Sequence, residues 1–94
     1  MAKFKIAHIR EQGVDLIIIP LESSFGHKTD GEQHKTVSAL QLCANSAGIA
    51  GTVVPVWQEG SGHRFIAPNN WHSFFKSFGW NDILRNINKE LTCD

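Results

Sequence analysis

The spacing of apolar residues along the chain predicts the kind of element in each run. Residues 4–9 (FKIAHI) alternate between two faces, which is typical of a strand. Residues 14–21 (VDLIIIPL) are apolar toward both faces, as in a strand that is buried on both sides of a sheet. The polar segment between them ends in Gly13, so the two runs predict a β-hairpin.

A helix is predicted after this hairpin, because apolar residues then recur every three or four positions. Asp30 is suited to cap its first turn, and Gln33 occupies the capping-box position. Gly48 supplies the C-terminal cap, and Leu42 lies off the apolar face. The apolar face consists of Val37, Leu40, Cys43, Ala44 and Ala47.

The rest of the chain predicts two strands and two helices. Residues 51–58 (GTVVPVWQ) and 63–67 (HRFIA) have strand patterns on either side of a turn. Pro55 cannot donate a ladder hydrogen bond, which places its strand at an edge or over a bulge. Residues 71–78 (WHSFFKSF) predict a short helix that ends at Gly79. Asn81 then caps a last helix, one face of which carries Ile83, Leu84, Ile87 and Leu91.

These elements predict a single α+β domain over residues 1–94, with a four-stranded sheet in the order ββα-ββ-αα. The first helix covers one face of the sheet. Two strands are apolar on both faces, so the other face needs a cover, either the C-terminal helices or a dimer partner. The element order over residues 4–67 resembles that of β-grasp modules such as ubiquitin-like and immunoglobulin-binding domains, without a diagnostic motif.

Residues 71–80 are rich in aromatic side chains, for which three roles are considered. They can form a helical face that packs on the sheet as core. They can form a protein interface, where aromatic residues are enriched. They can also line a ligand pocket. The interface candidates are Trp71, Phe75, Phe78 and Trp80.

The segment LESSFGHKTDGEQHK, residues 21–35, is the most chemically varied part of the chain. If the strands over 14–21 and 51–58 are parallel neighbours, this loop, the turn at 59–62 and the N-terminus of the first helix meet at one end of the sheet. Free amide groups at a helix N-terminus favour an anion. The candidate residues for binding a small anionic ligand are Ser23, Ser24, His27, Lys28, Ser61 and His63.

The same loop admits other interpretations. Its serines and histidines, with Asp30, supply the residue types of a hydrolase-like triad, but there is no GxSxG, HExxH or Walker motif. His27 and His34 are residue types that bind metals. The simplest alternative is a polar connector between a strand and a helix. The sequence therefore assigns no catalytic residue, no metal and no cofactor.

Composition narrows the classes of function. Of the 94 residues, 41% are hydrophobic and 19% are charged, which indicates a small globular domain with a thin stability margin. A formal net charge of zero argues against nucleic acid as a partner. The apolar run at 16–19 is too short for a signal or membrane-spanning segment, so the cytoplasm is the expected location. Cys43 and Cys93 form no disulfide framework, and Cys43 is expected to be a buried thiol.

Together these patterns predict a non-enzymatic binding or interaction module. It is expected to act as a homodimer through the apolar sheet or the aromatic helix. The alternative is a small anionic-ligand-binding protein, or a hydrolase-like enzyme, that uses the loop after the second strand.

Overall fold

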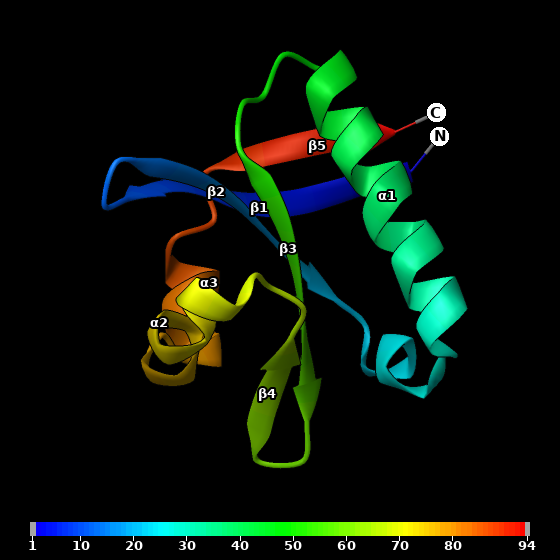
Figure 1. The fold of residues 1–94 in the computed structure, drawn as a ribbon, viewed down its shortest axis with the longest axis vertical. Helices are drawn as coiled ribbons and strands as arrows, with labels where there is room; N and C mark the ends of the chain where they lie inside the picture. Colours follow the sequence, from blue (N-terminus) through cyan, green and yellow to red (C-terminus); the bar gives the residue numbers. More distant parts are fainter. Residues whose placement is uncertain (1, 94) are drawn as a thin grey trace.

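The computed structural model describes residues 2–93, which form a five-stranded mixed sheet with helices on both faces (Figure 1). The strands are β1 (Ala2–Glu11), β2 (Val14–Leu21), β3 (Thr52–Glu59), β4 (Gly62–Phe65) and β5 (Lys89–Cys93). Their order in the sheet is β4-β3-β2-β1-β5. The pair β2–β3 is parallel, and the other neighbouring pairs are antiparallel. The α+β class is confirmed.

The apolar run of β2 explains its central place. Leu16, Ile17, Ile18 and Ile19 are all fully buried, and alternate residues contribute to the cores on opposite faces of the sheet. A tight turn that contains Gly13, with φ of 77°, joins β1 to β2. The predicted hairpin and the burial of this strand on both faces are therefore confirmed.

Both faces of the sheet are covered by helices of the same chain. Helix α1 (Asp30–Ser46) packs on one face through Leu40 and Ala44. Helices α2 (His72–Ser77) and α3 (Trp80–Arg85), preceded by the short helix η2 (Asn69–Trp71), pack on the other face. Trp71, Phe75 and Ile83 fill that second core. Of the two predicted covers, the structure shows the C-terminal helices.

The predicted last helix is wrong in its second half. Helix α3 ends at Arg85, and the chain then extends into β5, which pairs antiparallel with β1. Leu91 is fully buried from this strand, opposite Phe4 in the register. The extended backbone brings the chain alongside the otherwise open edge of β1, whose N–H and C=O groups gain partners there. The sheet consequently has five strands, and the expectation of four is wrong.

Two predicted helix caps are displaced by one or two residues. Asp30 is the first residue of α1, and the side-chain oxygen of Thr29 accepts a hydrogen bond from the first turn (3.2 Å). Asn81 lies inside α3, and Gly79 precedes that helix. The Gly79 N–H donates to the carboxylate of Asp82 (3.0 Å), which secures the start of α3.

Pro55 lies inside the sheet, so its predicted place at an edge or bulge is wrong. Strand β3 has β2 on one side and β4 on the other. The Pro55 carbonyl accepts from the N–H of Ile66 (3.1 Å), one residue beyond the end of β4. Because the nitrogen and carbonyl of a strand residue point to the same side, the missing donor of Pro55 falls where pairing with β4 ends.

Two side-chain amides complete the sheet where a neighbouring strand is missing. Gln41 of α1 accepts from the N–H of Val53 (2.9 Å) and donates to the carbonyl of Gly51 (3.0 Å). Asn88 accepts from the N–H of His8 (2.9 Å) and donates to the carbonyl of the same residue (2.9 Å). Each amide thus satisfies the backbone groups that a further strand residue would satisfy.

Candidate functional site

The parallel pairing of β2 and β3 provides the geometry on which the predicted ligand site depends. In this pairing Ile17 lies opposite Val53 and Leu21 opposite Trp57. The loop after β2 and the turn after β3 therefore leave the same end of the sheet. The predicted neighbourhood of these two connections is thus present in the fold.

The loop after β2 begins with a short 3₁₀ helix, η1 (Ser23–His27), held in place by one aromatic anchor. Phe25 is buried and meets Trp57 edge to face, with ring centroids 5.0 Å apart. The side chain of Gln33 donates to the Phe25 carbonyl (3.1 Å), which ties η1 to α1. The surrounding candidate residues are exposed, and they are Ser23, Ser24, His27 and Lys28.

The structure separates His63 from these loop residues. Trp57, under η1, pairs with Arg64 across the β3–β4 hairpin, so the adjacent His63 points to the opposite face of the sheet. Its Nε2 lies 3.0 Å from the carbonyl oxygen of Phe75 in α2. Ser61 is exposed in the hairpin turn. Four of the six candidates therefore share one loop, and His63 serves to hold α2 against β4.

Trp57 lies directly beneath the backbone of η1. Only 5% of its surface is exposed, and its Nε1 has no hydrogen-bond partner among residues 2–93. A Cβ atom placed on Gly26 would come within 2.5 Å of this Nε1. The contact between η1 and β3 is thus possible because residue 26 carries no side chain.

We expect Gly26→Ala to lower the free energy of unfolding by about 1–3 kcal/mol, because the new methyl group forces η1 away from Trp57. Chemical denaturation of the two proteins measures this difference. Gly31→Ala is the matched control, since a Cβ at Gly31 meets no atom within 4 Å. Equal stability of the Gly26 variant and the wild type would show that η1 is not packed on the indole.

The aromatic segment is divided between core and surface. Trp71 and Phe75 are buried against the sheet, which leaves them little exposed surface to offer a partner. Phe78 and Trp80 are half-buried at the margin of the same core. Phe78 also stacks on Phe74, with ring centroids 5.0 Å apart. The core role describes most of this segment.

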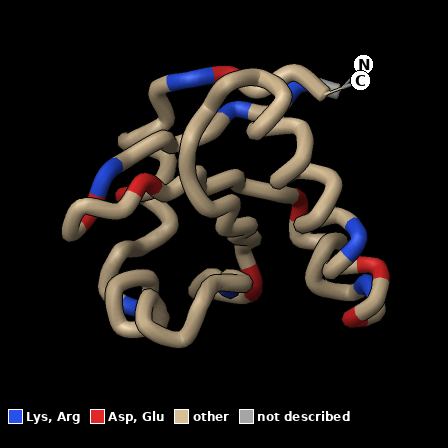
Figure 2. The backbone as a smooth tube through the Cα atoms, turned by 45° about the horizontal axis from the view of Figure 1, so that its top comes forward, with Lys and Arg blue, Asp and Glu red and all other residues tan. Residues whose placement is uncertain are grey.

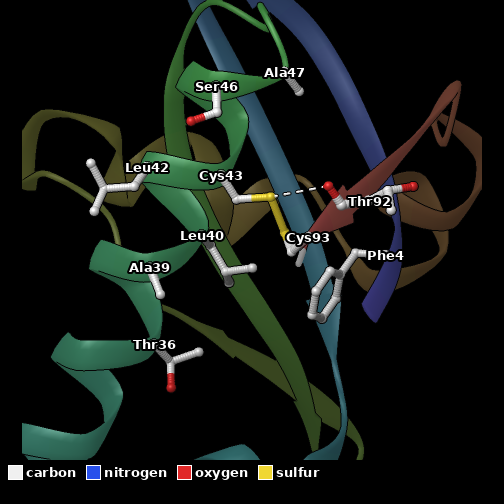
Figure 3. A pocket seen from close by; sticks show the side chains of 10 residues that line it. All are labelled: Phe4, Thr36, Ala39, Leu40, Leu42, Cys43, Ser46, Ala47, Thr92 and Cys93. Atoms are coloured by element: carbon white, nitrogen blue, oxygen red, sulfur yellow. Dashed lines mark hydrogen bonds between the residues drawn. A yellow bond between two sulfur atoms is a disulfide. The ribbon is translucent and has the colours of Figure 1, made fainter. Parts of the chain in front are cut away.

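A pocket of about 840 Å³ lies between α1 and β5, and a disulfide forms part of its wall (Figure 3). Cys43 of α1 is bonded to Cys93 of β5, with their Cα atoms 5.7 Å apart. The expectation that Cys43 is a buried thiol outside any disulfide is therefore wrong. The pairing arises because β5, rather than a helix, runs beside α1 at the end of the chain (Figure 1).

The other flank of α1 borders a second pocket of about 550 Å³, where Ile66, Ala67 and Pro68 leave the end of β4. Leu42 lines both pockets, and 67% of its surface is exposed. In Figure 3 it points away from the side of α1 that carries Cys43. Leu42 thus forms an apolar ridge between two hollows.

The surface around this ridge carries no formal charge. Residues 36–58 contain no Asp, Glu, Lys or Arg, and this run includes the last three turns of α1. Figure 2 accordingly shows the charged positions of α1 only near its N-terminal end. Among residues 2–93 there is no group of three or more His, Cys, Asp or Glu side chains arranged to hold a metal ion. The residues around Leu42 are therefore apolar or polar without charge.

Of the Leu42 ridge and the Cys43–Cys93 disulfide, only the ridge has a signal in the sequence. The absence of charge over residues 36–58 and the position of Leu42 off the apolar face both point to an exposed apolar ridge. Nothing in the fifty-residue separation of Cys43 and Cys93 indicates that they meet.

No protein family model matches the chain, no curated protein resembles it significantly, and no solved structure does. The likeness to β-grasp modules therefore remains one of element order.

Proposed function

We propose that the chain is a non-enzymatic interaction module that forms a homodimer through the outer face of α1. We define the α1 outer face as Ser38, Ala39, Leu42, Asn45 and Ser46, all of which are exposed. The observation that carries the proposal is the exposure of Leu42 in the middle of this uncharged surface. Of the surfaces expected from the sequence, the sheet is covered by the chain's own helices, and the aromatic segment packs Trp71 and Phe75 on the sheet.

The absence of charge supports a docking role for this face. A helix on the surface of a monomeric protein usually carries charged residues on its solvent side. The central part of a protein interface is instead depleted of charge, because desolvating a charged group is costly. The α1 outer face shares this lack of charge, and it presents one large apolar side chain among small residues.

A second copy of the chain is the partner that this surface fits. In a two-fold symmetric dimer the same patch must serve as both ridge and hollow. Leu42 supplies the ridge, and the pockets on either side of it supply the hollows. An uncharged patch also meets its own copy without like-charge repulsion. A domain of this size gains stability from such a contact.

We expect Leu42→Lys to weaken self-association at least about 30-fold, the effect of losing one hot-spot residue. Sedimentation equilibrium over a concentration series measures the association constant. Leu84→Lys is the matched control, because Leu84 is also exposed (43%) but lies on α3, on the opposite face of the sheet. A wild-type protein that is monomeric throughout the series, or equal effects of the two variants, would contradict the proposal.

The alternative, an anionic-ligand site, is only partly supported, because the six predicted residues do not all lie together. Ser23, Ser24, His27 and Lys28 share the loop before α1, but His63 faces the other side of the sheet. A hydrolase-like arrangement that pairs His63 with a loop serine is therefore not supported. We favour the interaction module over this alternative.

We keep the cytoplasm as the proposed location. No helix formed by residues 2–93 has both the length and the apolar character needed to cross a bilayer. Thiols are kept reduced in the cytoplasm, so the Cys43–Cys93 disulfide requires an explanation there. Disulfides that do occur in that compartment are usually transient and respond to the redox state.

A further inference from the structure

The Cys43–Cys93 disulfide can be approached from solvent. Both cysteines are half-buried, and both line the open pocket between α1 and β5 (Figure 3). Reduction of a disulfide requires an attacking thiolate to reach one of the two sulfur atoms. A bond at the wall of an 840 Å³ pocket meets this requirement without unfolding of the domain.

We propose that Cys43–Cys93 is a redox latch: a dithiol reductant opens it in the folded protein, which frees β5 from α1. The site is thus a reversible modification site, and the chemical class of its partner is a dithiol, either a small molecule or a protein of the dithiol-reductase kind. This inference does not depend on the homodimer.

The reaction balances as two exchange steps. A thiolate of the reductant attacks Sγ of Cys43, an S–S bond forms between them, and the Cys43–Cys93 bond breaks with its electron pair on Cys93. The second thiolate of the reductant then attacks its own sulfur in this mixed disulfide and releases Cys43. Two protons from the reductant's thiols end on the two cysteines. The protein disulfide is reduced by two electrons, and the dithiol is oxidised to a disulfide.

Cys93 is the better leaving group of the pair. The carbonyl oxygen of Thr92 lies 3.3 Å from Sγ of Cys43, and Cys43 is in the last turn of α1. Carbonyl groups at both places repel a negative charge on that sulfur. The same Thr92 oxygen can accept a hydrogen bond from Cys43 once it is a protonated thiol. The first step therefore cuts the tether of β5.

Strand β5 is the element that responds to this cut. It is an edge strand of five residues with β1 as its one neighbour in the sheet. Apart from the disulfide, its attachments are the pairing with β1 and the buried side chain of Leu91. Strands β1, β2 and β3 each have neighbours on both sides. Reduction is therefore expected to raise local opening of β5 while the centre of the sheet stays closed.

Opening of β5 has a defined structural result. The outer edge of β1, from Ala2 to Ile6, loses its partner and presents unpaired N–H and C=O groups. Such an edge can accept an extended segment from another chain. The reductant thereby changes which backbone surface the protein offers to a partner.

The test uses the full chain in native buffer with dithiothreitol as the probe. The oxidised chain has no free thiol within the described residues, and two should appear on reduction, since the sequence contains two cysteines. We expect reduction in native buffer within about tenfold of its rate in guanidinium chloride. Hydrogen exchange of the β5 amides should then be at least about tenfold faster, with β2 and β3 amides still protected.

Two results would overturn the latch. Thiols that appear only in denaturant would show a buried structural disulfide, as in an exported protein. Exchange of the β5 amides at the same free energy of opening as the β2 and β3 amides would show that the bond holds the whole domain and not one strand. The Leu42→Lys variant is measured in parallel, so that a dimer cannot shield the bond and a failure of the homodimer is recognised separately.

A variant without the bond gives an independent check. Cys43→Ser/Cys93→Ser should show the fast β5 exchange without reductant and no further change when dithiothreitol is added. If this variant does not fold, the wild-type thiol measurement still decides the accessibility of the bond.

Discussion

Replacing Cys43 and Cys93 with serine is expected to lower the free energy of unfolding by about 4 kcal/mol. The disulfide closes a loop between residues 50 positions apart, and such a cross-link restricts the unfolded chain more than the folded one. For a domain of this length, the loss corresponds to a fall in Tm of roughly 20 °C. Denaturation in guanidinium chloride measures the free energy directly.

Reductant provides the matched control for this measurement. The oxidised wild type should lose the same stability when it is reduced, and the double serine variant should be indifferent to reductant. A difference below about 1 kcal/mol between oxidised wild type and variant would contradict the expectation, since it lies well under the usual range for a native disulfide in a small domain.

Phe75→Ala is expected to cost about 3–5 kcal/mol, because the side chain is fully buried between α2 and the sheet. Its ring packs against those of Phe65 and Phe74, at centroid distances of 5.4 and 5.1 Å, and the alanine leaves a cavity there. Chemical denaturation measures the loss. Lys76→Ala on the exposed side of the same helix should change the stability by less than about 0.5 kcal/mol.

The same variant separates two of the three roles considered for the aromatic segment, core and interface. If Phe75 is core, as its burial indicates, the solution mass of the variant equals that of the wild type under conditions where both are folded. A variant of normal stability with an altered mass would instead assign Phe75 to an interface.

The sequence pattern predicts the centre of this fold better than its margins. The run Leu16–Ile19 has no polar position, so burial on both faces is the arrangement that removes all four side chains from water. That demand in turn requires a cover on both faces, which the structure supplies with helices of the same chain. These statements depend on local composition alone, which is why they can be made without knowledge of the tertiary structure.

The C-terminal strand could not be predicted for a physical reason. In β5 a single side chain, Leu91, is fully buried, while Lys89, Glu90 and Thr92 are exposed. One apolar residue cannot distinguish a period of two from a period of 3.6, and its spacing from Ile87 fits a helix. The segment forms a strand because it pairs with the open edge of β1, which lies about 85 positions away in the sequence.

The error at β5 carries over to the candidate site. Cys93 meets Cys43 because β5 runs beside α1, so a chain that is helical to its end gives no reason to pair them. The prediction that His63 lies beside the loop residues is wrong because it considers the end of the sheet and not its face. The loop and the hairpin turn do leave the same end of the sheet, but the alternation of side chains in β4 sends His63 to the far face. Proximity of backbone segments does not fix the side on which a residue lies.

The amides of Gln41 and Asn88 bear on how the protein behaves at high concentration. Unpaired N–H and C=O groups at strand edges are the points at which folded sheets pair edge to edge and grow into fibres. Here two side chains occupy backbone groups of β3 and β1 that β4 and β5 are too short to reach. These stretches of backbone are thereby closed to a further strand, and lateral growth of the sheet is confined to the outer edges of β4 and β5.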